Sequence, residues 1–252
     1  MTQSKLDVSR ASQSIKDHRF VEALSLLEGN LSKDPQHIDS LYLAAVCSRY
    51  LKNYKDSQKY LETVLAISPD MGRAYQELGH LNRDSGNENS SITYYRQACE
   101  LNPALLSSWN SLYNYFTKTK NKPAADHALD QIKTLKSIPA NLLYISQILN
   151  EGRLGLAETK CREFLKKNPT HTYAMSLLSQ IADRLGYFDD AEFLLKNAVK
   201  FKPNNGDLRM KYAMILRKKQ KFAETLEQVN ILCEMYPDNL SYQAQKASEI
   251  MQ

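Results

Sequence analysis

Two series of prolines, each spaced at 34 residues, constrain the fold of this chain more than any other feature of its sequence. The first series is Pro35, Pro69 and Pro103, and the second is Pro169, Pro203 and Pro237. The two series are separated by 66 residues, which is two residues fewer than two further units would require. A fixed period of this kind is typical of a repeat protein, in which one supersecondary unit recurs and stacks on its neighbours.

A column of small residues recurs with the same period. Its members are Ala23, Ser57, Ser91, Ala125, Ala157, Ala191 and Thr225. Four residues after them come Leu27, Leu61, Tyr95, Leu129, Cys161, Leu195 and Val229. A spacing of four places both columns on one face of a helix, and a small side chain there lets a second helix approach closely. The columns therefore predict seven helix pairs.

The columns resemble the tetratricopeptide repeat (TPR), a 34-residue helix-turn-helix family. The third unit carries the motif residues Tyr75, Leu78, Gly79, Ser91, Tyr95, Ala98 and Pro103, and the fourth carries Trp109, Leu112 and Phe116. The resemblance covers nearly the whole chain. It implies an all-α fold, a right-handed α-solenoid (TPR superhelix) of antiparallel helix pairs.

The period places the repeats at about 4–35, 36–69, 70–103, 104–137, 138–169, 170–203 and 204–237, with a cap helix at 239–250. The predicted pairs are 4–17 with 20–33, 37–51 with 54–67, 71–85 with 88–101, 105–119 with 123–136, 140–151 with 154–167, 171–185 with 188–201, and 205–219 with 222–235. Because a pair buries its apolar face only against its neighbours, we expect one solenoid over 1–252.

The fifth repeat is irregular. Ser137 stands where the terminal proline is expected, and we expect Pro139 to begin a short first helix, as proline suits a first turn. Near 117–152 this irregularity favours either a hinge or altered curvature, or a deletion that leaves the curvature almost unchanged.

Composition excludes several classes of protein. With 42% hydrophobic residues among 252, the chain can bury a core, yet no apolar run reaches the roughly 20 residues that span a bilayer. The first ten residues lack the apolar segment of a secretory signal, so we expect a cytoplasmic protein. Cys47, Cys99, Cys161 and Cys233 form no CxxC pair and are expected to be reduced core residues.

No motif of catalysis or cofactor binding is present. The histidines His18, His37, His80, His127 and His171 are isolated, and there is no HExxH, no glycine-rich phosphate loop and no GxSxG. We expect no enzyme activity, no cofactor and no metal.

The resemblance implies instead a concave groove lined by the first helix of each pair, with ligand contacts at repeat positions 2, 5, 9, 12 and 13. In this sequence the implied contacts are Tyr42, Arg49, Tyr50, Arg73, Gln76, His80, Arg83, Asn110, Asn114, Tyr173, Ser176, Gln180, Met210, Met214, Arg217 and Lys218. Among them Tyr42, Arg49, Arg73 and Arg83 are the expected N-terminal anchors, since arginine grips carboxylates with two hydrogen bonds. For each residue, an ordinary solvated surface role is the alternative.

Two specialised TPR sites are not matched. The carboxylate clamp that holds chaperone tails needs lysines and asparagines, whereas this chain offers Asn110 and Asn114 without the lysine, and Ile145 at the next asparagine position. The asparagine ladder of glycosyltransferase superhelices is replaced by Ser9, Leu43, Glu77, Ser111, Ile145, Leu177 and Lys211.

The segment from Lys196 to Lys221 is strongly basic. It contains Lys196, Lys200, Lys202, Arg209, Lys211, Arg217, Lys218, Lys219 and Lys221 against the single acid Asp207, in a chain of net charge +5. Lys211, at repeat position 6, is also predicted to contact the partner, so Lys211, Arg217 and Lys218 belong to both this segment and the implied groove. A solvated basic face is the first explanation, an acidic protein partner the second, and nucleic acid the least favoured.

The sequence therefore predicts a non-catalytic module that binds a partner peptide or helix in its concave groove. The alternative is a regulatory or substrate-presenting region of a larger enzyme, because similar repeats precede transferase domains such as bacterial sulfotransferases. The sequence indicates neither the partner nor the oligomeric state.

Overall fold

The structure is a computed structural model that describes residues 3–250, with side chains from Leu6 onward. All regular secondary structure in the described residues is helical. The helices are α1 (Gln3–Lys16), α2 (Phe20–Leu31), α3 (Ile38–Tyr50), α4 (Tyr54–Ile67), α5 (Gly72–Asp84), α6 (Glu88–Leu101), α7 (Leu106–Lys118), α8 (Lys122–Lys136), α9 (Ala140–Asn150), α10 (Leu154–Lys167), α11 (Thr172–Arg184), α12 (Phe188–Phe201), α13 (Gly206–Lys218), α14 (Phe222–Met235) and α15 (Leu240–Ile250). Each predicted helix agrees with its counterpart to within two residues at both ends, so the all-α prediction is confirmed.

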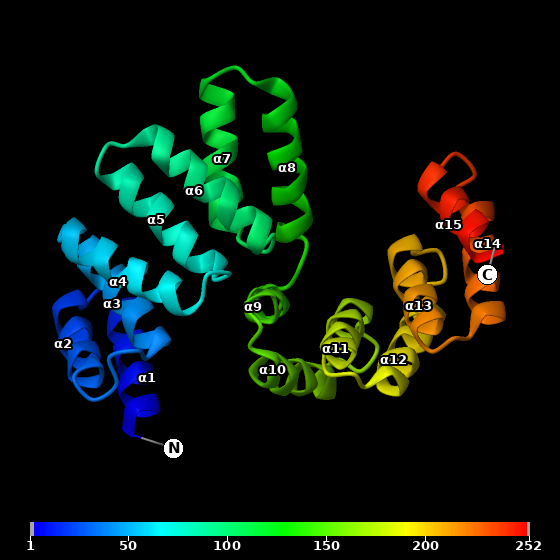
Figure 1. Ribbon diagram of the computed structural model, residues 1–252, viewed down its shortest axis with the longest axis horizontal. Coiled ribbons are helices and arrows are strands. Elements are labelled where there is room, and N and C mark those ends of the chain that lie inside the picture. Colours follow the sequence, from blue (N-terminus) through cyan, green and yellow to red (C-terminus); the bar gives the residue numbers. More distant parts are fainter. Residues whose placement is uncertain (1–2, 251–252) are drawn as a thin grey trace. The chain divides into compact units, whose positions relative to one another are not determined.

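The chain forms two compact units, Met1–Ile138 and Pro139–Gln252. Unit 1 contains the pairs α1/α2, α3/α4, α5/α6 and α7/α8, and its first helices also contact one another in order (Figure 1). Unit 2 contains α9/α10, α11/α12 and α13/α14, and α15 packs on α14. Each unit stacks antiparallel helix pairs as an α-solenoid does. A single solenoid across both units stays a prediction, as does a hinge near 117–152.

The column of small residues is buried in all seven pairs. Two of its hydroxyls also bridge the helices of a pair: Ser57 Oγ donates to the Ala45 carbonyl and Ser91 Oγ to the Gly79 carbonyl, both at 2.9 Å. At Gly79 a Cβ would lie 2.6 Å from the Tyr95 ring, so the close approach of α5 to α6 requires glycine there.

The fifth pair accommodates the two missing residues in its first helix. α9 has 11 residues, whereas α7 and α11 have 13 each. Pro139 is the N-cap of this helix and lies just outside its first turn, one position earlier than expected. The second helix of the pair, α10, keeps 14 residues, so the deletion shortens one helix and leaves the repeat otherwise intact.

Three of the four cysteines are core residues, as predicted. Burial raises the pKa of the Cys47, Cys99 and Cys161 thiols to about 12, so these groups stay protonated at neutral pH. Cys233 is only partly buried. No helix among the described residues has the length and apolar character needed to cross a membrane.

The turn inside each pair contains one residue with positive φ. These residues are His18, Lys52, Gly86, Lys120, Gly152, Gly186 and Gln220. A side chain with a Cβ is strained in this conformation, whereas glycine adopts it readily. The turn geometry therefore recurs in every repeat, although only three of the seven residues are glycine.

We expect Gly152→Ala to lower the free energy of unfolding by about 1–2 kcal/mol, because φ is +72° there and no neighbouring atom contributes a clash. Gly155→Ala, on α10 with open space around it, is the matched control and should leave stability equal or higher. Urea denaturation followed by far-UV circular dichroism measures both. Equal effects of the two substitutions would contradict the assigned turn.

Candidate functional site

The candidate site consists of side chains on the first helices of the pairs, considered separately in each unit. Among residues 3–250 no group of three or more His, Cys, Asp or Glu side chains lies close enough together to hold a metal ion. The contacts that these helices make are hydrogen bonds, ion pairs and apolar contacts.

In unit 1, neighbouring first helices are joined through the residues that the resemblance placed in the groove. The Arg73 guanidinium of α5 lies 4.9 Å from the centre of the Tyr42 ring of α3. Gln76 of α5 accepts a hydrogen bond from Ser108 Oγ of α7 at 3.0 Å. These side chains line the first-helix face, and each already has a partner within the protein.

Arg49, which the sequence predicts as a groove contact, is buried and already paired within unit 1. Its side chain is only 7% exposed, and its guanidinium contacts Glu77 Oε1 at 2.5 Å and Asp84 Oδ2 at 2.7 Å. Burial alone would lower the pKa of Arg49, but these two carboxylates raise it above its usual value. Burial raises the pKa of Glu77, and Arg49 opposes that rise. Arg49 thus links α3 to α5, and a partner could reach it only by breaking these pairs.

His80 of α5 is a second groove position that is largely enclosed. Its Nδ1 lies 2.6 Å from the Tyr95 hydroxyl of α6, and its Nε2 lies 3.4 Å from Ser107 Oγ of α7. Burial, reinforced by the positive charges of Arg49 and Arg83, lowers the pKa of His80 to about 4. The imidazole is therefore neutral at physiological pH and cannot serve as a cationic anchor there.

Four further predicted residues of unit 1 are more accessible. Tyr50 is 51% exposed and stacks on Phe20, with ring centres 4.4 Å apart. Arg83 is exposed and pairs with Asp84 at 3.0 Å. Asn110 is partly buried and donates to the Leu106 carbonyl at 2.8 Å, whereas Asn114 is exposed on the same helix.

In unit 2, the structure brings several predicted residues together around one cavity of about 230 Å³ between α11 and α13. The cavity, which we call the first-helix cavity, is lined by Ser179, Gln180, Asp183, Leu195, Lys211, Met214, Ile215 and Lys218. Lys218 Nζ pairs with Asp183 Oδ2 at 2.7 Å, and Lys211 Nζ with Asp207 Oδ2 at 2.7 Å. Met214 is 55% exposed and offers a flexible apolar side chain.

The remaining predicted residues of unit 2 do not line this cavity. Tyr173 and Met210 are partly buried. Ser176 is buried, and its Oγ lies 3.4 Å from Lys211 Nζ. Arg217 pairs with the buried Glu249 of α15 at 2.9 Å, so it ties α13 to α15.

The basic segment is much less charged in the fold than in the sequence. Besides Asp207, five carboxylates form ion pairs with basic residues of the segment, and all five lie outside it in the sequence. They are Asp183, Asp189, Glu192, Glu224 and Glu249. Arg209 is buried and donates to Gln228 and to the Pro203 carbonyl. Lys196, Lys200 and Lys202 are exposed. Counting charges along the chain therefore overstates the field of this surface.

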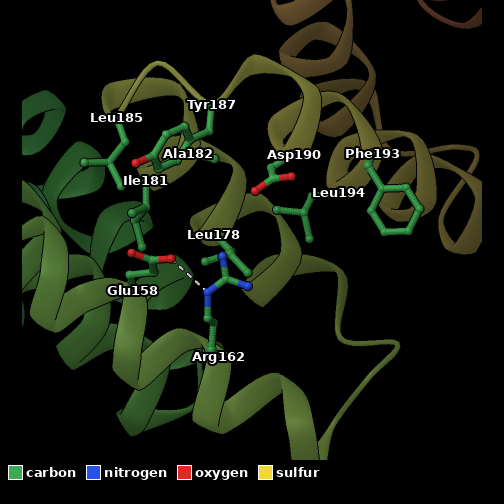
Figure 2. A pocket seen from close by; sticks show the side chains of 10 residues that line it. All are labelled: Glu158, Arg162, Leu178, Ile181, Ala182, Leu185, Tyr187, Asp190, Phe193 and Leu194. Carbon is green, nitrogen blue, oxygen red and sulfur yellow. Dashed lines mark hydrogen bonds and ion pairs between the residues drawn. The ribbon is translucent and has the colours of Figure 1, made fainter.

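A second cavity of about 250 Å³ lies between α10, α11 and α12, and sequence reasoning missed it. We call it the second-helix cavity. Figure 2 shows Phe193 at one edge of the cavity and Leu185 and Tyr187 on the other side. Arg162 of α10 and Asp190 of α12 approach it from opposite sides, and Arg162 Nε donates to Glu158 Oε1 at 2.8 Å.

A signal for the second-helix cavity is present in the repeat alignment. The residues equivalent to Phe193 in the other pairs are Ser25, Lys59, Thr93, His127, Thr159 and Glu227. A phenylalanine in a column that is otherwise polar marks an unusual surface, because this position is exposed in every repeat.

Two neighbouring repeats of unit 1 match a known family model. Residues 38–71 and 72–105 each match the family model of the tetratricopeptide repeat. No curated protein matches the chain.

Several solved structures are similar to the chain. Naa15/Naa10 bound to HypK-THB is 18% identical with a TM-score of 0.48, and the match covers 99% of this chain but 39% of that one. TTC0263, a thermophilic TPR protein of Thermus thermophilus, is 18% identical with a TM-score of 0.38, covering 99% of this chain and 100% of that one. A tetratricopeptide repeat protein from Parabacteroides merdae is 11% identical with a TM-score of 0.45, covering 99% and 100%.

The partly buried His80 should make unit 1 sensitive to acid. Its pKa is about 4 in the folded protein against 6.5 for a free imidazole, so the unfolded state binds the proton first as the pH falls. The contribution of His80 to the free energy of unfolding is therefore close to zero well above pH 6.5. It becomes unfavourable between pH 6.5 and 4, by a total on the order of 3 kcal/mol. His80→Gln, which cannot titrate, should lose less stability over this range.

Trp109 is the only tryptophan of the chain and packs in unit 1, so its fluorescence during urea unfolding at pH 7, 5.5 and 4.5 reports on this unit. His18→Asn, which replaces an exposed histidine of the same unit, is the control for the substitution itself. If wild type and His80→Gln lose stability in parallel, His80 does not carry the effect.

Proposed function

We propose that this chain, a member of the tetratricopeptide repeat family, is a non-catalytic module that binds a segment of a partner protein on the first-helix face of its repeats. The observation that carries the proposal is the first-helix cavity of unit 2. Gln180, Lys211, Met214 and Lys218, four residues that the sequence placed in the groove, line this one cavity.

The lining of the first-helix cavity suits a peptide. Met214 and Ile215 offer apolar contact, and Met214 can adapt to side chains of different shape. Gln180 carries an amide, and although it donates to the Ser176 carbonyl at 3.2 Å, an amide has further donor and acceptor capacity for a peptide backbone. The cavity therefore combines an apolar anchor with polar groups beside it, which is the usual arrangement of a recognition site.

The two lysines of the cavity can exchange partners at small cost. Lys211 and Lys218 are both partly exposed and paired with aspartates, and exposed ion pairs of this kind contribute only about 0–1 kcal/mol. A carboxylate of the bound segment could replace either aspartate. Since both lysines start out neutralised, an overall acidic partner stays a prediction, and a segment of mixed character fits the lining better.

In unit 1 the first-helix face supports the proposal less strongly. Arg49 is buried, His80 is partly buried and hydrogen-bonded to Tyr95, and Gln76 is hydrogen-bonded to Ser108 of α7. Tyr50, Arg83 and Asn114 are the accessible residues, and they would add contacts at this face. The alternative function, a regulatory region of a larger enzyme, stays a hypothesis that no contact in the described residues favours.

A selection from a displayed library of random 12-residue peptides tests the proposal with the full chain as bait. We expect enriched peptides whose affinity falls at least tenfold on Met214→Glu, because the substitution places a charge in the apolar part of the first-helix cavity. Leu240→Glu is the matched control, since it adds the same charge at a residue that is 76% exposed and lines neither cavity.

Isothermal titration calorimetry of each enriched peptide with the wild type, Met214→Glu and Leu240→Glu measures the change in affinity. If the enriched peptides bind wild type and Met214→Glu equally, or if no peptide is enriched, the first-helix cavity is not a peptide site.

A further inference from the structure

We infer that the second-helix cavity of unit 2 is a separate docking site, and that its occupant is a segment of another protein that inserts a bulky apolar side chain flanked by a lysine or arginine. The inference rests on the repeat columns, the size of the cavity and the charges at its rim. None of the ten lining residues belongs to the first-helix cavity. It is therefore independent of the proposal for the first helices.

The sixth repeat departs from the other six where it lines this cavity. Phe193 occupies the column that is polar in every other pair. Tyr187 is likewise the only apolar residue at the N-cap of a second helix, where the other pairs have Arg19, Asn53, Asn87, Asn121, Arg153 and Lys221. These two unusual residues line the same cavity, which a random distribution of surface residues would not favour.

The apolar residues around the second-helix cavity are accessible. Phe193 is 68% exposed, Tyr187 57% and Leu185 37%. Neither Phe193 nor Tyr187 is needed to fill the core of unit 2, because the small residue Ala191 and Leu195 of the same helix already pack there. Exposed apolar side chains gathered around one hollow indicate an interaction site more than scattered ones do.

The size of the second-helix cavity favours a side chain over a small molecule. Its volume of about 250 Å³ lies below the roughly 300–1,000 Å³ of most small-molecule sites. Leu178, Ile181 and Ala182 of α11 form an apolar floor, and Leu194 of α12 adds to it. One large aliphatic or aromatic side chain of a partner can be desolvated there, as interface anchors are.

The charges at the rim favour a basic residue beside that anchor. Glu158 and Asp190 both line the cavity, against the single cation Arg162. Arg162 is already hydrogen-bonded to Glu158, whereas the exposed Asp190 carboxylate makes no ion pair within the described part of the chain. A lysine or arginine of the partner, placed next to the apolar anchor, would pair with Asp190 and correct the imbalance.

The test uses the same library of random 12-residue peptides with the full chain as bait, and each enriched peptide is titrated against variants. Peptides of this site should contain an aromatic or large aliphatic residue within a helical turn of Lys or Arg. Their affinity should fall at least tenfold on Phe193→Ser and at least fivefold on Asp190→Lys. Phe201→Ser, an exposed phenylalanine on the same helix that does not line the cavity, should change it less than twofold.

A charge swap separates recognition from general disturbance of the fold. Replacing the basic residue of the peptide by Glu should weaken binding to wild type and restore binding to Asp190→Lys. Far-UV circular dichroism checks that each variant is folded. We expect both to fold, because Phe193 and Asp190 are exposed.

Three outcomes would overturn the inference. In the first, the enriched peptides all respond to Met214→Glu and none to Phe193→Ser. In the second, the charge swap restores nothing. In the third, sedimentation shows that the chain self-associates and that Phe193→Ser abolishes the association, in which case a second copy is the occupant.

Discussion

A small side chain, buried at the same position of the second helix in each pair, lets the two helices of that pair approach closely. The column from Ala23 to Thr225 is buried throughout, although its residues change between alanine, serine and threonine. In the third pair, Gly79 of α5 faces the ring of Tyr95 of α6, where a Cβ would not fit. This contact fixes how a first helix lies on its second helix. The positive-φ residue of the turn and the side chains of the first-helix face take their positions from it.

Several polar residues that the sequence predicted for recognition instead hold neighbouring helices together. Arg49 joins α3 to α5 through Glu77 and Asp84, and Arg217 joins α13 to α15 through Glu249. Breaking such a pair leaves a buried charge without its partner, which is far more costly than losing an exposed pair. The two cavities of unit 2, where we propose recognition, are lined instead by exposed apolar residues such as Phe193 and Met214 and by partly exposed ion pairs such as that of Lys218 with Asp183.

The sequence predicts the helices well because every boundary is repeated seven times, so one irregular repeat cannot obscure the period. It predicts contacts between repeats poorly. Arg49 meets Glu77 and Asp84, which lie 28 and 35 residues further along the chain, and a helix-by-helix pattern carries no sign of that pairing. Counting charges in the basic segment from Lys196 to Lys221 overstates its net charge for the same reason, since most of its carboxylate partners come from other helices. Phe193 and Tyr187, in contrast, could have been found by comparing equivalent positions of the repeats.

Hydrogen exchange of the Ala191→Leu variant, followed by mass spectrometry, tests the central role of the small column most directly. Ala191 of α12 is fully buried, and α12 packs against α11. The larger leucine side chain should therefore lower the free energy of unfolding by about 1–3 kcal/mol. Because each repeat contacts only its neighbours, exchange should quicken in α11 and α12 while α3 to α6 stay protected. Lys196→Leu, at an exposed position of α12, should leave protection unchanged. Unchanged protection of α11 and α12 in Ala191→Leu would contradict the account.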